Sequence, residues 1–378
     1  MTIKEQLEQC RKMSVVSEKD FNDVYIDNYG VTYSNDGKRL LKGNDVKDYI
    51  VKEGTEVICN ESFQDCFEVG DIVFPQSLRY IGAKVFTSCG SFTLPNGLLG
   101  IGEEAFLLAG YNDYLEIPDS VIFLGEGAFE GSTVLEVSIG KGLKRIEEGC
   151  FYSSLMRTVK ISDSVNYIGD LAFGDNYIEE IVIPPSVKEV DGNPFGGWVK
   201  RIVSLSDNYV VKDNALYSKD GKDLIVCMSK EKELIIPDTV ESIHSHAFLW
   251  SCVESLVLPD SINTIGEGAF SCSKIRTIHL PNGINSIPAF AFYKSEIQSI
   301  TIPNTVKQIE GYAFQGCKKL KEVRMSDALL AIEEHAFAYC MDLETLKLPK
   351  DLKTIGEKAF FCCHELKKYE EELGVKII

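Results

Sequence analysis

The chain has 378 residues, of which 44% are hydrophobic, and its formal net charge is −18. This hydrophobic fraction supports a large packed core and excludes global disorder. The negative charge disfavours nucleic acid and anionic membrane surfaces as partners. No run reaches the ~18 apolar residues that a transmembrane helix needs, which argues against membrane insertion.

The first 45 residues are expected to cap the N-terminal end of the molecule. Residues 2–13 predict a short helix and lack the apolar core of a signal peptide, so the sequence alone predicts a cytoplasmic protein. Asp36-Gly37 then separates two strand-like runs. Because an Asp-Gly pair in this setting is typical of a β-hairpin, we predict a hairpin over residues 22–42.

A repeat follows, with a usual period of 20 to 23 residues. Its anchor is a Phe, usually preceded by Ala, at Phe63, Phe86, Phe106, Phe129, Phe151, Phe173, Phe195, Phe248, Phe270, Phe292, Phe314, Phe337 and Phe360. A Pro stands eleven residues before most anchors, as Pro303 does before Phe314. Apolar and polar residues alternate before this Pro, which predicts a half-buried strand that ends at the Pro.

Stacking of these copies predicts the fold. One copy alone cannot bury its apolar face, so neighbouring copies must stack and align their strands. We therefore predict an α/β-type repeat solenoid of about 13 coils, with one parallel sheet and an internal column of the anchor Phe side chains. The segment between each strand and its anchor is expected to be a compact turn or an irregular helical return.

The array is interrupted once, between Phe195 and Phe248, where the spacing rises to 53 residues. This interval contains a second Asp-Gly turn at Asp220, so we predict a second hairpin over residues 209–227. The predicted organisation is a helix and hairpin cap at 1–45, repeats at 46–200, a hairpin insertion at 201–232, and repeats with a C-terminal cap at 233–378.

These units resemble the BspA-like leucine-rich-repeat family of bacterial proteins. The pattern Ile-Pro-x-x-Val-x-x-Ile-Gly-x-x-Ala-Phe-x-x-Cys carries the resemblance, and it is nearly intact from Ile117 to Phe129 and from Leu258 to Phe270. The Leu-Tyr-Ser-Lys-Asp-Gly hairpin is also similar to that family, and the likeness covers about residues 22–370. The resemblance implies a right-handed leucine-rich-repeat superhelix and a cell-surface or secreted protein that adheres to host proteins or other cells.

The sequence offers little chemistry for catalysis or metal binding. His244 and His246 stand two residues apart, but they occupy a turn position of the repeat, and we interpret them as structural. Several cysteines fall three residues after an anchor, where a small buried residue would close the turn: Cys66, Cys89, Cys317, Cys340 and Cys363. Metal-ligand spacing is absent. We expect free, reduced thiols, no metal, no cofactor and no catalytic residue.

The outward residues of the strands form the candidate partner-binding face. Residues two before the Pro position include an apolar run, Val182, Ile235 and Val257, which is followed toward the C-terminus by His279, Thr301, Arg324 and Lys347. Residues four before it include Tyr114, Glu136, Glu180 and Glu233. Two interpretations stay open for the apolar run: the second hairpin covers it, or it is an exposed interaction patch. A ligand with an apolar centre and an acidic end would match the second.

We therefore predict a non-enzymatic protein-binding or adhesion module that presents its sheet surface to a protein partner, which the sequence does not identify. The alternative is a structural scaffold that associates with its own copies. An enzyme would need titratable groups gathered in a pocket, and the sequence shows no such cluster. We expect a monomer.

Overall fold

The computed structural model describes residues 1–364 and 366 of the chain. The predicted C-terminal cap extends to residue 378, so residues 365 and 367–378 of that prediction lie outside the described part. The chain forms two compact units, which we describe separately. The first comprises Met1–Val190 and Trp198–Ser206, and the second comprises Asp191–Gly197 and the residues from Asp207 onward.

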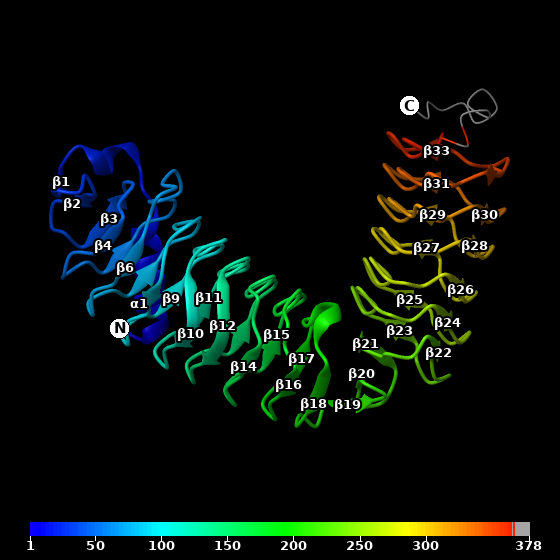
Figure 1. Cartoon of the computed structure of the whole chain (residues 1–378), viewed down its shortest axis with the longest axis horizontal. Coiled ribbons are helices and arrows are strands. Elements are labelled where there is room, and N and C mark those ends of the chain that lie inside the picture. Colours follow the sequence, from blue (N-terminus) through cyan, green and yellow to red (C-terminus); the bar gives the residue numbers. More distant parts are fainter. Residues whose placement is uncertain (365, 367–378) are drawn as a thin grey trace. The chain divides into compact units, whose positions relative to one another are not determined.

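The strands that precede the Pro positions stack in a column within each unit, and we call them the face strands (Figure 1). In the first unit these are β4 (Asp48–Ile50), β6 (Asp71–Val73), β8 (Phe92–Thr93), β10 (Tyr111–Ile117), β12 (Thr133–Ile139), β14 (Thr158–Lys160), β16 (Glu180–Ile183) and β18 (Arg201–Ser204). In the second unit they are β22 (Glu233–Ile235), β24 (Ser255–Val257), β26 (Thr277–His279), β28 (Ser299–Thr301), β30 (Glu322–Arg324) and β32 (Thr345–Leu346). Where neighbouring face strands pair, they pair in parallel.

A second column of two-residue strands, the return strands, lies between each Pro position and its anchor. The first unit has β5 (Val57–Ile58), β7 (Tyr80–Ile81), β9 (Gly100–Ile101), β11 (Phe123–Leu124), β13 (Arg145–Ile146), β15 (Tyr167–Ile168) and β17 (Glu189–Val190). The second unit has β23 (Ser242–Ile243), β25 (Thr264–Ile265), β27 (Ser286–Ile287), β29 (Gln308–Ile309), β31 (Ala331–Ile332) and β33 (Thr354–Ile355). These strands also pair in parallel from coil to coil.

The prediction of a repeat solenoid with stacked parallel strands is confirmed. The structure differs from the expected single sheet, because the return segment is a second ladder instead of an irregular turn or helix. A strand of two residues is too short to show an alternating pattern in the sequence. The described residues contain fourteen face strands against thirteen anchors, because β18 belongs to a coil without an anchor Phe.

In each unit a three-stranded antiparallel hairpin precedes the first return strand. The first is β1 (Val24–Ile26), β2 (Thr32–Ser34) and β3 (Arg39–Lys42), and the second is β19 (Tyr209–Lys212), β20 (Ala215–Ser218) and β21 (Asp223–Cys227). The last strand of each hairpin pairs in parallel with the first return strand of its unit, β5 or β23. Each hairpin therefore covers the open end of one return column, which would otherwise expose unpaired backbone groups.

The two Asp-Gly turns have the same hydrogen bonds. Gly37 N–H donates to the Ser34 carbonyl at 2.8 Å, and the Ser34 hydroxyl donates to Asp36 Oδ1 at 2.7 Å. In the second turn, Gly221 N–H donates to the Ser218 carbonyl at 2.9 Å, and the Ser218 hydroxyl donates to Asp220 at 2.8 Å. Both glycines adopt positive φ, 70° and 74°, a region that favours glycine. The predicted insertion thus repeats the N-terminal cap.

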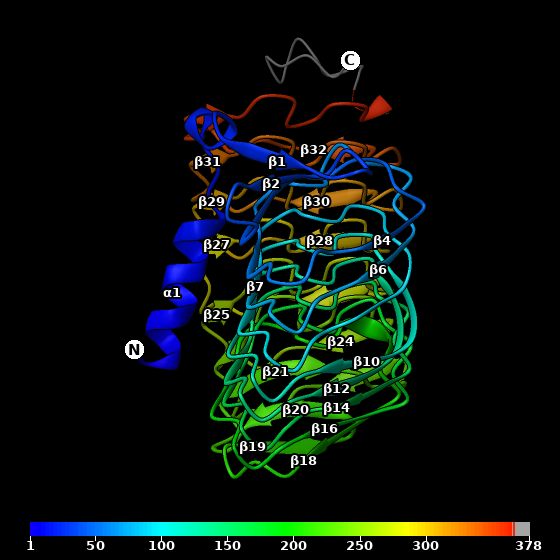
Figure 2. The ribbon, with the colours of Figure 1, turned by 90° about the vertical axis from the view of Figure 1, so that its left-hand side faces the viewer.

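Helix α1 (Ile3–Ser14) lies along the side of the first unit, over its return strands (Figure 2). It begins with a capping box between Thr2 and Glu5. Leu7 and Cys10 are buried against a cluster that includes Val57 and Tyr80. At Gly100 a Cβ atom would lie 2.7 Å from Leu7 Cδ1, so glycine makes room for the helix. The short 3₁₀ helices η1 (Glu18–Phe21) and η2 (Gly196–Trp198) are also present.

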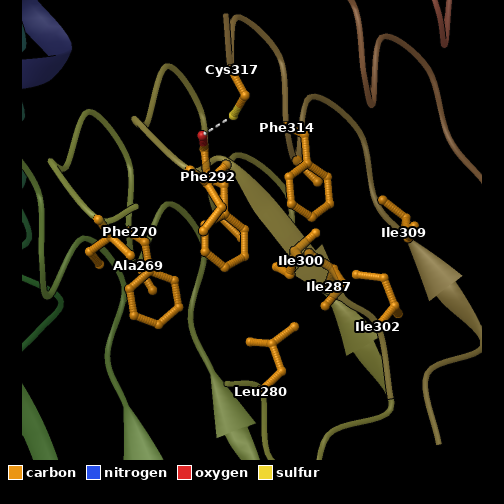
Figure 3. Packing of buried hydrophobic residues seen from close by; sticks show 14 of the residues in the cluster. Ala269, Phe270, Leu280, Ile287, Phe292, Ile300, Ile302, Ile309, Phe314 and Cys317 are labelled. Atoms are coloured by element: carbon orange, nitrogen blue, oxygen red, sulfur yellow. Dashed lines mark hydrogen bonds between the residues drawn. The ribbon is translucent and has the colours of Figure 1, made fainter. Parts of the chain in front are cut away.

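The anchor Phe side chains form the predicted internal columns. All thirteen are at most 1% exposed. In the second unit, the rings of Phe292 and Phe314 stack with centroids 5.1 Å apart and planes within 2° (Figure 3). The anchor turns also join coils through the backbone, since Phe292 N–H donates to the Ala313 carbonyl of the next coil at 2.7 Å. Within a unit, coils with an anchor Phe therefore contact one another through ring stacking and backbone hydrogen bonds of the face strands, the return strands and the anchor turns.

In several coils the position three residues after the anchor supplies a hydrogen-bond donor. Ser132 Oγ donates to the Phe129 carbonyl at 2.7 Å, and Asn176 Nδ2 donates to the Phe151 carbonyl at 2.7 Å. In the second unit the thiols of Cys317, Cys340 and Cys363 donate to anchor carbonyls one coil earlier, at 2.9 to 3.1 Å. Burial raises the pKa of the Cys340 thiol well above its usual value, which keeps its proton available to donate. These cysteines satisfy buried carbonyls, a function that size alone did not predict.

Replacement of Phe292 by Ala should lower the free energy of unfolding by about 3–5 kcal/mol, because it removes a ring stacked on both sides and leaves a cavity. Denaturant unfolding of the full chain measures this effect. Thr301→Ala, an exposed substitution on a face strand, is the matched control and should change stability by less than about 0.5 kcal/mol. A loss below about 1 kcal/mol for Phe292→Ala would contradict the stacked-Phe account.

The twelve cysteines should all titrate as free thiols after denaturation without reductant. None forms a disulfide in the structure, and eight are buried. In the native protein we expect the exposed Cys252 to react first and the buried thiols slowly, because reaction requires an accessible thiolate. Recovery of markedly fewer than twelve thiols from the denatured chain would instead show a disulfide framework.

Candidate binding surface

The face strands fix the direction of the candidate residues. In β28 the central Ile300 is buried while Ser299 and Thr301 are exposed, and β30 has the same pattern. Side chains alternate across a strand, so an apolar central residue that packs inward turns its two neighbours outward. The outward positions of successive strands then form rows at intervals of about 4.8 Å.

The second unit carries one such row. Register pairs Ile235 with Val257 and Val257 with His279, while Thr301 pairs with Arg324 further along. Ile235 is 76% exposed and Val257 is 49% exposed. The second hairpin occupies the return column, where β21 pairs with β23, and leaves both side chains open to solvent. The second hairpin therefore does not cover Ile235 and Val257, and for these two residues the interpretation as a covered run is wrong.

The C-terminal end of this row is a groove of mixed charge. Arg324 and Lys347 line a cavity of 680 Å³ together with apolar side chains such as Met325 and Leu348. Arg324 Nε lies 2.9 Å from Glu322 Oε1, and this hydrogen bond raises the pKa of the arginine. The lining holds three cations and three carboxylates. This balance of charge favours the acidic end of a ligand less strongly than the predicted row from His279 to Lys347 implied.

The first unit carries the other four candidate residues. Tyr114, 55% exposed, pairs in register with Glu136 and lines a hollow of 400 Å³. Glu180 Oε2 forms a 2.8 Å ion pair with Arg201 Nη1 and is therefore not an isolated charge. Val182 is 38% exposed. The eleven candidates thus divide between the two units, four on the first and seven on the second, and in each unit they occupy both of the outward positions that the sequence suggested.

A second apolar pair, Ile50 and Val73, was not proposed from the sequence. Ile50 is 74% exposed and Val73 is 55% exposed, and they face each other in the register of β4 and β6. They occupy the first two face strands after the first cap, as Ile235 and Val257 do after the second. Alignment of the two Asp-Gly hairpins could have revealed this equivalence, but Val51-Lys52 follows β4 where the repeat usually has Pro, which hid the strand.

The histidines and cysteines do not assemble a reactive centre in the described part of the chain. His244 Nε2 lies 4.0 Å from Asp223 Oδ1. His246 adopts positive φ in an anchor turn and donates its N–H to the next coil, which is a structural position. No group of three or more His, Cys, Asp or Glu residues among those described could hold a metal ion. No helix of the described residues has the length and hydropathy to cross a membrane.

The comparison with known families bears on these surfaces. A family profile described as BspA type Leucine rich repeat region (6 copies) matches residues 37–93, 87–200, 227–297 and 285–378. The chain belongs to the BspA-type leucine-rich-repeat family. Such repeat proteins typically interact with proteins or are surface proteins, and the family is generally non-enzymatic. No curated protein matches the chain.

Several solved structures are similar to this member of the BspA-type family. A leucine-rich cell surface protein from Faecalibacterium prausnitzii is 25% identical, with a TM-score of 0.67 over 88% of this chain and 94% of that chain. The pneumococcal vaccine antigen PcpA is 19% identical, with a TM-score of 0.55 over 87% and 92%. A leucine-rich-repeat protein from Eubacterium ventriosum is 19% identical, with a TM-score of 0.54 over 84% and 91%. The last two likenesses concern the fold alone.

Proposed function

We propose that this chain is a non-enzymatic protein-binding module that presents its face strands to a partner protein. The observation that carries the proposal is the exposed pair Ile235 and Val257, which lie side by side on β22 and β24. When a partner covers two large aliphatic side chains that were in contact with water, the free energy of the system falls, and this favours binding. Exposed apolar clusters with a polar surround commonly mark interaction sites.

The pair is held rigidly, which favours binding. The residue between Ser255 and Val257 is the buried Leu256, and it belongs to the apolar core of the second unit. Backbone pairing on both sides of β24 fixes the direction of Val257. A partner therefore does not have to order a mobile loop, and the entropic cost of association is reduced.

The first unit carries an equivalent pair, which supports a second site of the same kind. Ile50 and Val73 repeat the chemistry of Ile235 and Val257, and an acidic residue, Asp48 or Glu233, lies two positions before the isoleucine in each case. Adhesion to a protein on another cell or on a host, as the family resemblance implies, is the role that we propose for such binding.

Substitution of Val257 by Asp should strongly reduce capture of partner proteins by the immobilised full-length chain. A charge at this position cannot be buried without a large desolvation cost. Quantitative mass spectrometry of proteins captured from bacterial and host extracts measures the effect. Val257→Asp combined with Val73→Asp should abolish the remaining capture, because the second pair is then lost as well.

Lys307→Asp is the control, since Lys307 is exposed and lies outside the face strands, directly before β29. Circular dichroism establishes that each variant is folded. Equal capture by wild type, the control and the double variant would place the binding site elsewhere. Light scattering of the unliganded chain tests the scaffold alternative, in which concentration-dependent growth of the particle should disappear with the double variant.

A further inference from the structure

A groove of 510 Å³ lies at the edge of the second unit, on the turns that follow the anchors Phe292, Phe314 and Phe337. Its lining includes Tyr293, Tyr339 and Met341, with Gly316 between the two tyrosine-bearing coils. These residues do not belong to the face strands, so this groove is a separate surface from the one in the proposed function. Nothing in the fold requires a hollow at this position.

The absence of a side chain at Gly316 opens the groove. The residue two positions after the anchor has positive φ in this unit, and at Lys294, Gly316 and Tyr339 the values are 52°, 73° and 60°. The backbone ladder runs unbroken past the glycine, because Lys294 N–H donates to the Gln315 carbonyl and Gly316 N–H to the Ala338 carbonyl, both at 2.8 Å. A Cβ atom added at Gly316 would lie 3.0 Å from Cγ of the flexible Lys294 side chain, whereas at Gly131, the corresponding glycine of the first unit, it would lie 2.4 Å from Leu108 Cδ2.

The aromatic walls are supported from behind. The ring of Tyr293 makes an edge contact with Phe290, with centroids 5.7 Å apart, and that of Tyr339 makes one with Phe361 at 5.4 Å. Tyr339 is 39% exposed and Met341 is 38% exposed. Rings that are fixed before a ligand arrives lose little entropy on binding, and they favour another flat or apolar group between them.

The rim of the groove is positive although the chain as a whole is acidic. Three lysines line it, against one carboxylate, Glu296. Glu296 Oε2 is already offset by Lys319 Nζ at 3.0 Å and Arg276 Nε at 3.7 Å. Lys294 lies over the Tyr293 ring, and its hydrogen bond to that tyrosine raises the lysine pKa. Lys318 is exposed and has no ion-pair partner among the described residues, so it can meet an incoming carboxylate.

We propose that this groove binds an acidic–aromatic segment of a partner protein. An aromatic side chain of the partner lies between Tyr293 and Tyr339, and a carboxylate next to it meets Lys318. An acidic sugar fits less well, because its hydroxyls need several polar partners. Ser295 is buried and its hydroxyl is 3.5 Å from Cys317 Sγ, which leaves Gln315 and the two tyrosine hydroxyls as the uncharged polar groups of the lining, and that of Tyr293 is already hydrogen-bonded to Lys294.

The test uses the full chain and the capped peptide acetyl-Glu-Phe-Glu-amide, with binding followed by saturation-transfer NMR and titration. Acetyl-Gln-Phe-Gln-amide removes the charge, and acetyl-Glu-Ala-Glu-amide removes the ring. We expect each matched peptide to bind at least about fivefold more weakly than the first, and added salt to weaken only the charged peptides. Equal binding of all three peptides, or no binding of the first at millimolar concentration, would overturn the proposal.

Two variants locate the site. Lys318→Glu reverses the exposed charge, and Gly316→Asn fills the hollow with a residue that tolerates positive φ. Each should weaken acetyl-Glu-Phe-Glu-amide at least about fivefold, whereas Lys307→Glu and Val257→Asp should leave its binding unchanged. The last variant separates this proposal from the proposed function. Binding that neither groove variant weakens would refute the site, and binding of glucuronic acid in place of the peptide would show a sugar site instead.

Discussion

Stacking of each coil on its neighbours is the constraint on which the rest of the structure depends. A single coil has one Phe and a few aliphatic residues, too few to form a core of its own. Between two neighbours, the Phe314 ring is covered by Phe292 on one side and Phe337 on the other, with centroids 5.1 and 4.9 Å away. The anchor turn adds backbone hydrogen bonds in the same direction, such as that from Phe314 N–H to the Ala336 carbonyl at 2.7 Å.

This constraint explains both the caps and the surfaces. An array that depends on neighbours is weakest at its ends, so each unit starts with a hairpin whose last strand continues the return column. Stacking also repeats every outward position at a fixed interval, which turns small sequence changes into a surface pattern. Exposed aliphatic side chains at two adjacent coils make a patch, as at Ile235 and Val257, and a missing side chain at Gly316 makes a groove.

The repeat made much of this fold predictable, because thirteen Phe anchors and the Pro eleven residues before most of them fix the strand, the core column and the coil length. The return strands were missed, since pairing over two residues such as Gln308–Ile309 leaves no periodic signal. For the candidate surface, the row positions could be read from the sequence. The exposure of Ile235, the ion pairs that neutralise Glu180 and Arg324, and the Gly316 groove depend on contacts between coils that spacing alone does not specify.

Hydrogen–deuterium exchange of the full chain, resolved along the sequence, tests the stacking account most directly. The account predicts that anchor amides inside a unit, such as Phe129, Phe292 and Phe314, exchange slowest, because each donates to the next coil. Amides bonded only within their own turn, such as Lys318 to Gly316, should exchange much faster. Equal exchange rates for these two classes would contradict the claim that contacts between coils hold the molecule together.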